Sequence, residues 1–180
     1  MYKFTLSKHE GRILGQFIDA LPLNLKRPPK DNLPESLVFN DVKSRRLIDR
    51  AAEDLETQNK PYIDLVDSLV EKQQAFIKEN YQEEIDALNK AKESAPAEEK
   101  AVVQGQLEAL VNKINRLLVE EFKSINDEIE KVKDEKVVFE LADNKFKNVK
   151  EAFDVGIFQI NVPKDVAYAI DEAFEVAVKE

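Results

Sequence analysis

Hydrophobic and polar residues near the start of the chain follow first a strand pattern and then a helix pattern. Residues 2–6, YKFTL, alternate in polarity and carry aromatic and β-branched side chains, which favours a short strand. Ser7 and Glu10 have the spacing of a capping box, in which both side chains bond free backbone N–H groups of the first helical turn. The residues that follow predict a helix ending at Pro22, with one buried face: Ile13, Leu14, Phe17, Ile18 and Leu21.

Four of the seven prolines lie in residues 22–36, which predicts an extended segment rather than a helix or a central strand. Residues 37–40, LVFN, could form a second strand, and Asn40 or Asp41 could cap the next helix. The apolar residues of that helix are Leu47, Ile48, Ala51, Ala52 and Leu55. The polar run TQNKP at 57–61 predicts an interruption, with Pro61 in the first turn of a new helix.

A long coiled-coil pattern occupies the middle of the chain. Apolar residues recur at alternating three- and four-residue steps on both sides of the break KESAPAEEK at 92–100, which predicts two antiparallel helices of about 45 Å. Gly105, inside the second helix, predicts a bend or a close helix crossing. The first helix carries Tyr62, Val66, Leu69, Gln73, Phe76, Ile77, Tyr81, Ile85 and Leu88; the second carries Val103, Leu107, Leu110, Ile114, Leu117, Leu118, Phe122, Ile125, Ile129 and Val132.

After Lys136 the spacing of hydrophobic residues no longer follows the coiled-coil pattern and again predicts alternating strands and helices. Residues 137–141 predict a strand. Asp143 is predicted to cap a helix that ends at Gly156, and residues 157–162 predict a further strand. The helix predicted to begin at Pro163 has one apolar face: Val166, Ile170, Ala173, Phe174 and Ala177.

Strand, helix, strand and helix therefore follow one another both before and after the coiled coil. The echoes include F-x-L at 4–6 and 139–141 and ID-x-A-x-E at 48–53 and 170–175. Any two strand–helix units share some pattern, so the echo could also arise without symmetry. We expect a mostly helical α+β fold: a small α/β body of two strand-helix-strand-helix halves, 1–60 and 134–180, with a helical hairpin arm inserted at 61–133.

Charge narrows the possible partners. The chain of 180 residues is 35% charged, with a net charge of −9 and a pI near 4.9, which disfavours direct binding to nucleic acid or to an anionic membrane. Lys residues are interleaved with the acids, so solvated helix faces explain the charges better than mimicry of DNA does. The N-terminal residues lack the pattern of a signal peptide, and no apolar run approaches the ~18 residues that span a bilayer.

Few residues could carry catalytic chemistry. The chain has no Cys and one His, which excludes Cys-ligated zinc and iron–sulfur sites and the H-E-x-x-H and paired Glu-x-x-His motifs. Neither common phosphate-binding Gly motif nor a calcium loop is present. We expect no enzyme activity, no cofactor and no metal.

Three groups of residues are candidates for contact with a protein partner. Lys26, Arg27 and Lys30 form a dense positive spot, which suits an acidic partner, although a solvated loop explains it as well. The predicted hairpin turn carries Ala95, Pro96 and Ala97. The apolar seam contributes Leu110 and Ile114, whose replacement by Asp should abolish assembly if the arm drives it. Gly11 and Gly15 form G-x-x-x-G, which in a short helix favours close packing within the body.

The order of segments resembles that of small uncharacterised proteins encoded in tailed-phage genomes. The residues that carry the resemblance are Leu21-Pro22-Leu23 after the early helix, the charged helical middle, and the stretch from Glu120 to Glu175 that includes KVVFEL, FKNVKEAF and VPKDVAYAIDEAFE. No functional residues can be transferred. The resemblance implies a phage context, as a virion or assembly component or an early protein acting on the host, located in the host cytoplasm or the virion.

The function expected from these observations is that of a structural or assembly protein of a bacteriophage particle. Its partners would be proteins, either further copies of itself or other virion proteins, and neither nucleic acid nor membrane. The alternative is a phage-encoded inhibitor that binds a host enzyme or defence complex through its acidic surface. A third option is a chaperone-like adaptor that uses the hairpin to hold client helices.

Overall fold

The computed structural model describes residues 1–21, 42–156 and 162–180 and is mostly helical, as the sequence predicts. The described chain forms two compact units: the first contains Met1–Ile63 and Val132–Glu180, and the second contains Asp64–Lys131. In chain order the elements are β1 (Tyr2–Ser7), α1 (Lys8–Ala20), α2 (Val42–Asn80), α3 (Gln82–Ser94), α4 (Ala97–Glu121), α5 (Lys123–Val132), β2 (Lys136–Leu141), α6 (Asp143–Gly156), α7 (Lys164–Glu175) and β3 (Val178–Lys179).

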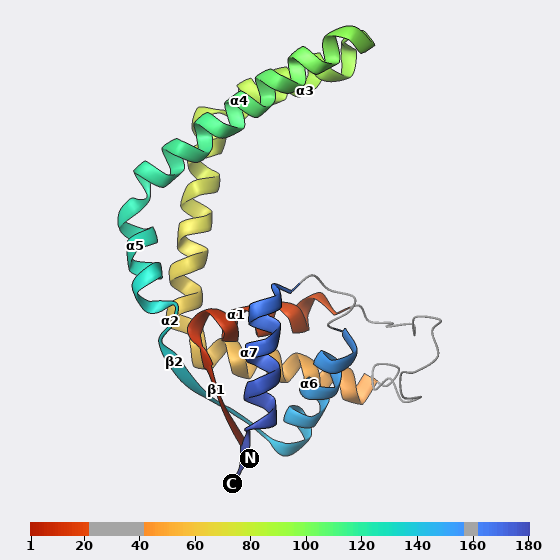
Figure 1. Ribbon diagram of the computed structural model, residues 1–180, viewed down its shortest axis with the longest axis vertical. Coiled ribbons are helices and arrows are strands. Elements are labelled where there is room, and N and C mark those ends of the chain that lie inside the picture. Colours follow the sequence, from red (N-terminus) through yellow and green to blue (C-terminus); the bar gives the residue numbers. More distant parts are fainter. Residues whose placement is uncertain (22–41, 157–161) are drawn as a thin grey trace. The chain divides into compact units, whose positions relative to one another are not determined.

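The first unit is built on an antiparallel sheet of strand order β2-β1-β3 within the described residues. β1 and β2 lie side by side (Figure 1), with Phe4 opposite Phe139, and β3 pairs with the start of β1 through Tyr2 and Lys179. Because strand side chains alternate between faces, one face of the sheet is buried and the other exposes residues such as Val138 and Glu140. The predicted strands at 2–6 and 137–141 are therefore confirmed, whereas β3 was not predicted.

Four helical segments cover the buried face of this sheet. α1, α6, α7 and the first part of α2 contribute the largest share of one apolar core, and Phe rings from five elements meet inside it. The Phe4 ring centroid lies 5.4 Å from that of Phe174, and the Phe17 centroid lies 5.3 Å from that of Phe153. The helical faces predicted from three- and four-residue spacing are confirmed as core, including Leu14, Ile18, Ile48, Leu55 and Ile170.

Residues that match between the two predicted halves share some structural features. Phe4 and Phe139 occupy opposing places on paired antiparallel strands, and each strand leads directly into a helix, α1 or α6. Ile48 on α2 and Ile170 on α7, the first residues of the repeated ID-x-A-x-E, are both fully buried. The division of the body into two strand-helix-strand-helix halves stays a prediction. The strands predicted at 37–40 and 157–162 lie outside the described residues, apart from Val162, which is not in a strand.

The predicted interruption at 57–61 is wrong, because α2 runs through these residues with Pro61 inside it. The polar side chains there bond backbone groups of neighbouring elements instead of marking a loop. The Gln58 side chain accepts a hydrogen bond from Glu140 N–H at 2.7 Å and donates one to Glu140 O at 3.1 Å. Asn59, only 2% exposed, donates to the carbonyl oxygen of Lys8 at 2.7 Å. Gln58 thereby provides hydrogen-bond partners for backbone groups on the outer edge of β2.

The ends of α6 and α7 differ in detail from the prediction. Asp143 lies in the first turn of α6, and its carboxylate pairs with the N-terminal ammonium at 3.1 Å and with Lys179 of β3. α7 ends at Glu175, so the prediction that Ala177 belongs to this helix is wrong. Ala177 instead precedes β3, whose two residues are too few to produce a strand pattern in the sequence.

Gly11 confirms the close packing predicted for G-x-x-x-G, whereas Gly15 does not. A Cβ built on Gly11 would lie 2.4 Å from Cζ of Phe139, a fully buried ring on β2. A Cβ on Gly15 would have no heavy atom within 4 Å. Only the first of the two glycines therefore lets α1 approach the sheet.

The second unit is an antiparallel helical hairpin in which α3 and α4 lie side by side (Figure 1). The seam positions predicted between Val66 and Ile129 are all buried or half-buried, and Leu69, Leu110 and Ile114 are the most buried of them. The two arms are not unbroken helices, because α2 gives way to α3 at Tyr81 and α4 gives way to α5 at Phe122.

An aromatic cluster links these two breaks. The Phe76 ring centroid lies 6.0 Å from those of both Tyr81 and Phe122, and Lys113 Nζ lies 5.3 Å from the Tyr81 centroid. Aromatic contacts of this geometry stabilise a pair by roughly 0.5–1.5 kcal/mol beyond area burial. The cluster therefore holds the two arms of the hairpin together at the level where both change helix.

The predicted close helix crossing at Gly105 is wrong for the described residues, whereas the alternative of a bend stays a prediction. α4 continues through Gly105 from Ala97 to Glu121, and no heavy atom lies within 4 Å of a Cβ placed there.

The capping box of α1 gives a prediction for the pH dependence of stability. Glu10 accepts hydrogen bonds from Ser7 N–H at 2.6 Å and from Lys136 at 3.2 Å, and Ser7 Oγ accepts from Glu10 N–H at 3.1 Å. Burial raises the pKa of Glu10, but the hydrogen bonds from Ser7 and Lys136 outweigh burial and hold the pKa below its usual value. The charged form therefore stabilises the fold above the unfolded pKa of about 4.3, and this contribution is lost as the pH falls through the folded pKa.

We expect Glu10→Gln to lower the free energy of unfolding by about 1 kcal/mol at pH 7 and by less at pH 3. Urea denaturation at both pH values measures the difference. Glu56→Gln, which removes an exposed carboxylate on α2, is the control and should change stability little at either pH. An equal loss for Glu10→Gln at pH 7 and pH 3 would show that the carboxylate charge does not stabilise the cap.

Candidate protein interface on the second unit

The residues predicted to contact partners fall in three different environments. Lys26, Arg27 and Lys30 lie outside the described residues. At the turn of the hairpin, Ala95 is the half-buried C-cap of α3, exposed Pro96 is the N-cap of α4, and Ala97 begins α4. The structure thus brings these three together as the short connection between α3 and α4.

Leu110 and Ile114 are 5% and 4% exposed on the seam of the hairpin. Their side chains pack inside the second unit, so a partner could reach them only if the hairpin opened. Replacing them therefore tests the folding of the hairpin first and contact with a partner second.

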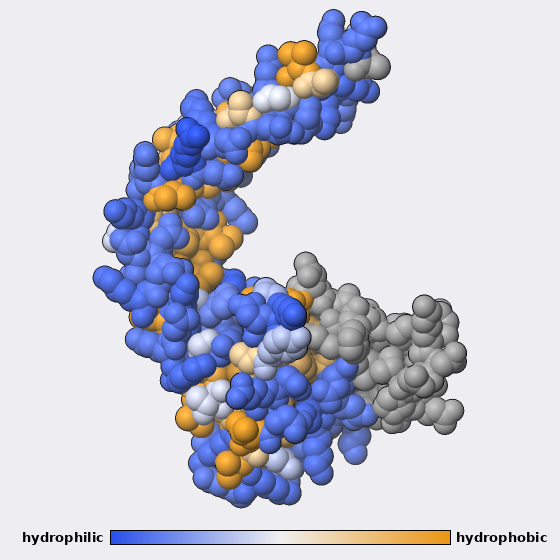
Figure 2. Space-filling view, in the orientation of Figure 1, coloured by the Kyte–Doolittle hydropathy of each residue, from blue (hydrophilic) through white to orange (hydrophobic). Residues whose placement is uncertain are grey.

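A different face of α4 is accessible and weakly polar. Alternating steps of three and four residues place its members on one line, the geometry of a helix-packing seam. We call this line the outer stripe: Val102, Gly105, Ala109, Asn112, Arg116 and Val119. All six are exposed, Val102 and Val119 at 64% each, and one of the six is charged in a chain that is 35% charged. Most of the visible surface of the second unit is hydrophilic, with hydrophobic residues scattered over it (Figure 2).

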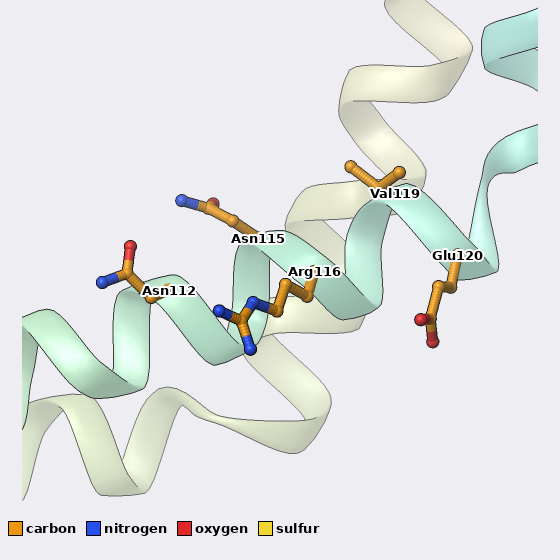
Figure 3. A pocket seen from close by; sticks show the side chains of 5 residues that line it. All are labelled: Asn112, Asn115, Arg116, Val119 and Glu120. Atoms are coloured by element: carbon orange, nitrogen blue, oxygen red, sulfur yellow. The ribbon is translucent and has the colours of Figure 1, made fainter.

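The C-terminal half of the outer stripe borders a shallow hollow of about 560 Å³. Figure 3 shows its five lining side chains projecting from successive turns of α4. They are Asn112, Asn115, Arg116, Val119 and Glu120. Two amides, a guanidinium and a carboxylate supply both donors and acceptors beside the methyl groups of Val119. These groups can donate and accept hydrogen bonds and pair with charges, so the hollow offers polar contacts to a bound partner.

The polar residues beside the stripe have few competing partners. Gln104 Nε2 donates to Glu108 Oε1 at 2.8 Å along α4. Arg116 makes no ion pair with any residue in the described part of the chain. The guanidinium, with five donors and a permanent charge, can therefore bind a carboxylate supplied from outside the hairpin.

Sequence reasoning missed the outer stripe because the seam on the opposite side of α4 is far more hydrophobic. A signal was nonetheless present. Val102, Gly105, Ala109, Asn112, Arg116 and Val119 have the same alternating spacing as the seam, with small or weakly polar residues where an isolated hairpin would carry charges.

The first unit has a second hollow, of about 420 Å³, with an aromatic floor and a charged rim. In the floor, the Tyr2 and Phe146 rings stack with centroids 4.2 Å apart. Lys150 Nζ bonds Glu175 at 2.8 Å on the rim. The hollow is lined by Tyr2, Phe146, Lys147, Lys150, Glu151, Asp154, Phe174, Glu175 and Ala177.

Carboxylates dominate the electrostatics of this rim. Burial raises the pKa of Asp154, and the neighbouring Asp171 and Glu175 add to the rise although Lys150 opposes it. Burial and Asp154 likewise raise the pKa of Glu151. Burial is the larger cause of both shifts, and the clustering of carboxylates that adds to them favours an approaching cationic group at this rim.

None of the helices in the described ranges has the length and apolar character needed to cross a bilayer. Comparison with known proteins gives no match to any family model, curated protein or solved structure.

Proposed function

We propose that the chain is a non-enzymatic assembly protein of a bacteriophage particle that acts through protein–protein contacts. The observation that carries the proposal is the outer stripe of α4, a weakly polar helical face exposed on a hairpin whose own seam is already closed. Helical faces of this kind are commonly buried against another helix.

The construction of the second unit supports this role. Its seam residues face inward between the arms, so the hairpin does not need the outer stripe for its own packing. α4 runs for 25 residues, about 37 Å at 1.5 Å per residue, which gives the stripe several successive turns of contact. A long and regular face favours a helical partner over a small-molecule ligand.

The phage context has a separate basis. It depends on the resemblance of residues 1–25 and 120–175 to small tailed-phage proteins, and not on the geometry of the hairpin.

Deletion of the gene from its phage genome, followed by electron microscopy of infected-cell lysates, tests the proposal. An assembly protein predicts normal phage DNA replication with incomplete or aberrant particles. Normal particle numbers, shape and infectivity after deletion would overturn it. The matched control is the deletion complemented by the wild-type gene on a plasmid.

The alternative function, inhibition of a host enzyme or defence complex, is favoured by the acidic rim of the first unit. Asp154 and Glu151 would attract a basic surface, and electrostatic attraction of this kind raises the association rate at low salt. The same deletion separates the two roles, because loss of an inhibitor would stop infection before particles form. A host-directed role also predicts binding to one host protein that weakens with added salt.

A further inference from the structure

Gly105 has no structural role within the described chain. Glycine in a helix interior costs roughly 1 kcal/mol relative to alanine, because the unfolded chain loses more conformational freedom. No heavy atom lies within 4 Å of a Cβ at this position, so the packing of the hairpin does not require glycine. The open space at Gly105 leaves room for the close approach of a group from another molecule.

The charges beside the outer stripe show what that molecule would look like. Glu108 and Arg116 lie one turn before and one turn after Asn112, and they have opposite charges. Gly105 lies two turns before Asn112 and leaves a gap in the face, and Val119 lies two turns after Asn112 and protrudes from it. The face is therefore complementary to its own reverse, which is the condition for a two-fold symmetric interface.

We propose that the outer stripe is a homodimer interface, in which α4 packs antiparallel against α4 of a second copy with the two-fold axis at Asn112. This inference rests on the proposed function and specifies the partner. Arg116 then pairs with Glu108 of the second copy, and the symmetry makes this ion pair twice. Val119 fits over Gly105 of the second copy, Asn115 faces Ala109, and the two Asn112 amides meet at the axis.

A parallel arrangement is disfavoured by the same residues. It would place Arg116 opposite Arg116 and Glu108 opposite Glu108, two like-charge contacts, and it would leave each Gly105 opposite a second Gly105. Both the charges and the shape of α4 thus favour the antiparallel register.

Disulfide trapping tests the register directly, because the chain has no Cys of its own. Asn112→Cys places two thiols at the proposed axis, where they can meet the Cβ separation of about 3.5–4.5 Å that a disulfide needs. We expect rapid formation of a covalent dimer under mild oxidation. Gln106→Cys, exposed on α4 but off the outer stripe, is the matched control and should remain largely monomeric on denaturing gels.

Charge reversal tests the two ion pairs. Arg116→Glu and Glu108→Arg each create two like-charge contacts, and each should weaken dimerisation about tenfold. An equimolar mixture of the two variants should form a heterodimer of wild-type affinity, because every contact then has opposite charges. Both side chains are exposed on α4, so circular dichroism should show unchanged helix content.

Each outcome has one meaning for the interface. Trapping of Asn112→Cys without Gln106→Cys, together with rescue in the mixture, supports the antiparallel dimer. Three results would overturn it: no trapping of Asn112→Cys, equal trapping of Gln106→Cys, or dimerisation that neither charge reversal weakens. The same results are expected if a different partner occupies the outer stripe. The gene-deletion experiment is independent of these results. A failed dimer test would leave the assembly role standing, and a failed deletion test would leave the dimer interface standing.

Discussion

Ile114→Asp is expected to unfold much of the second unit while leaving the first unit folded. Ile114 is 4% exposed on the seam, so the substitution buries a carboxylate without a partner beside apolar side chains. Uncompensated burial of charge destabilises proteins by about 3–5 kcal/mol. The second unit cannot absorb such a loss easily, because Leu69, Leu110 and Ile114 are its only buried seam residues within the described ranges and the others are half-buried.

Hydrogen exchange measured by mass spectrometry checks this expectation segment by segment. Peptides from residues 64–131 should lose protection in Ile114→Asp, whereas peptides from β1, β2 and α1 should exchange as in the wild type. Asn115→Asp is the matched control, because it introduces the same carboxylate one residue away on the exposed side of α4. Wild-type protection throughout residues 64–131 in Ile114→Asp would show that the seam does not hold the hairpin together.

Phe139→Ala is expected to cost about 3–5 kcal/mol, a large part of the stability of the first unit. The Phe139 ring is fully buried, lies 5.8 Å from the Phe4 centroid, and fills the space left by the missing Cβ of Gly11. Removing it leaves a cavity in the core beneath β2. The free energy of unfolding from urea denaturation measures the loss.

The contact between Phe139 and Gly11 makes a sharper prediction through a double-mutant cycle. Gly11→Ala alone should destabilise by about 1–3 kcal/mol, because the new Cβ overlaps the Phe139 ring. In the Phe139→Ala background the same substitution should be neutral or stabilising, since the ring is gone and alanine favours the helix. Gly15→Ala, which meets open space on the same helix, should stabilise slightly in both backgrounds. Additive effects at positions 11 and 139 would contradict the packing described for this pair.

Local sequence patterns predicted those parts of the fold that depend on local physics. The seam of the hairpin follows from unbroken three- and four-residue spacing, and the α1 cap follows from Ser7 and Glu10 alone. β1 and β2 follow from alternation over five or six residues. In each case the residues that produce the pattern also make the contact, so no knowledge of distant segments was needed.

The failures arose where a residue serves a distant part of the chain. Gln58 and Asn59 appeared to interrupt a helix because their polarity could not be matched to Glu140 and Lys8 without the structure. β3 forms because its two residues meet the start of β1, which no local pattern records.

The outer stripe was missed for the opposite reason. Its signal is local but weak, since it consists of charges that are absent rather than apolar residues that are present. The sequence pattern favours the seam residues Leu110 and Ile114 as contact residues. Their burial within the hairpin leaves the opposite side of α4 as the accessible surface.

The solution mass of the wild-type chain, measured by light scattering on a sizing column over a wide concentration range, tests the proposed mode of action most directly. If the chain dimerises through the outer stripe, the measured mass should rise with concentration from the 20.6 kDa of one chain to twice that mass. Gly105→Leu, which fills the gap opposite Val119 without touching the hairpin seam, should shift this rise to higher concentration. A mass of 20.6 kDa at every concentration would contradict self-association through α4.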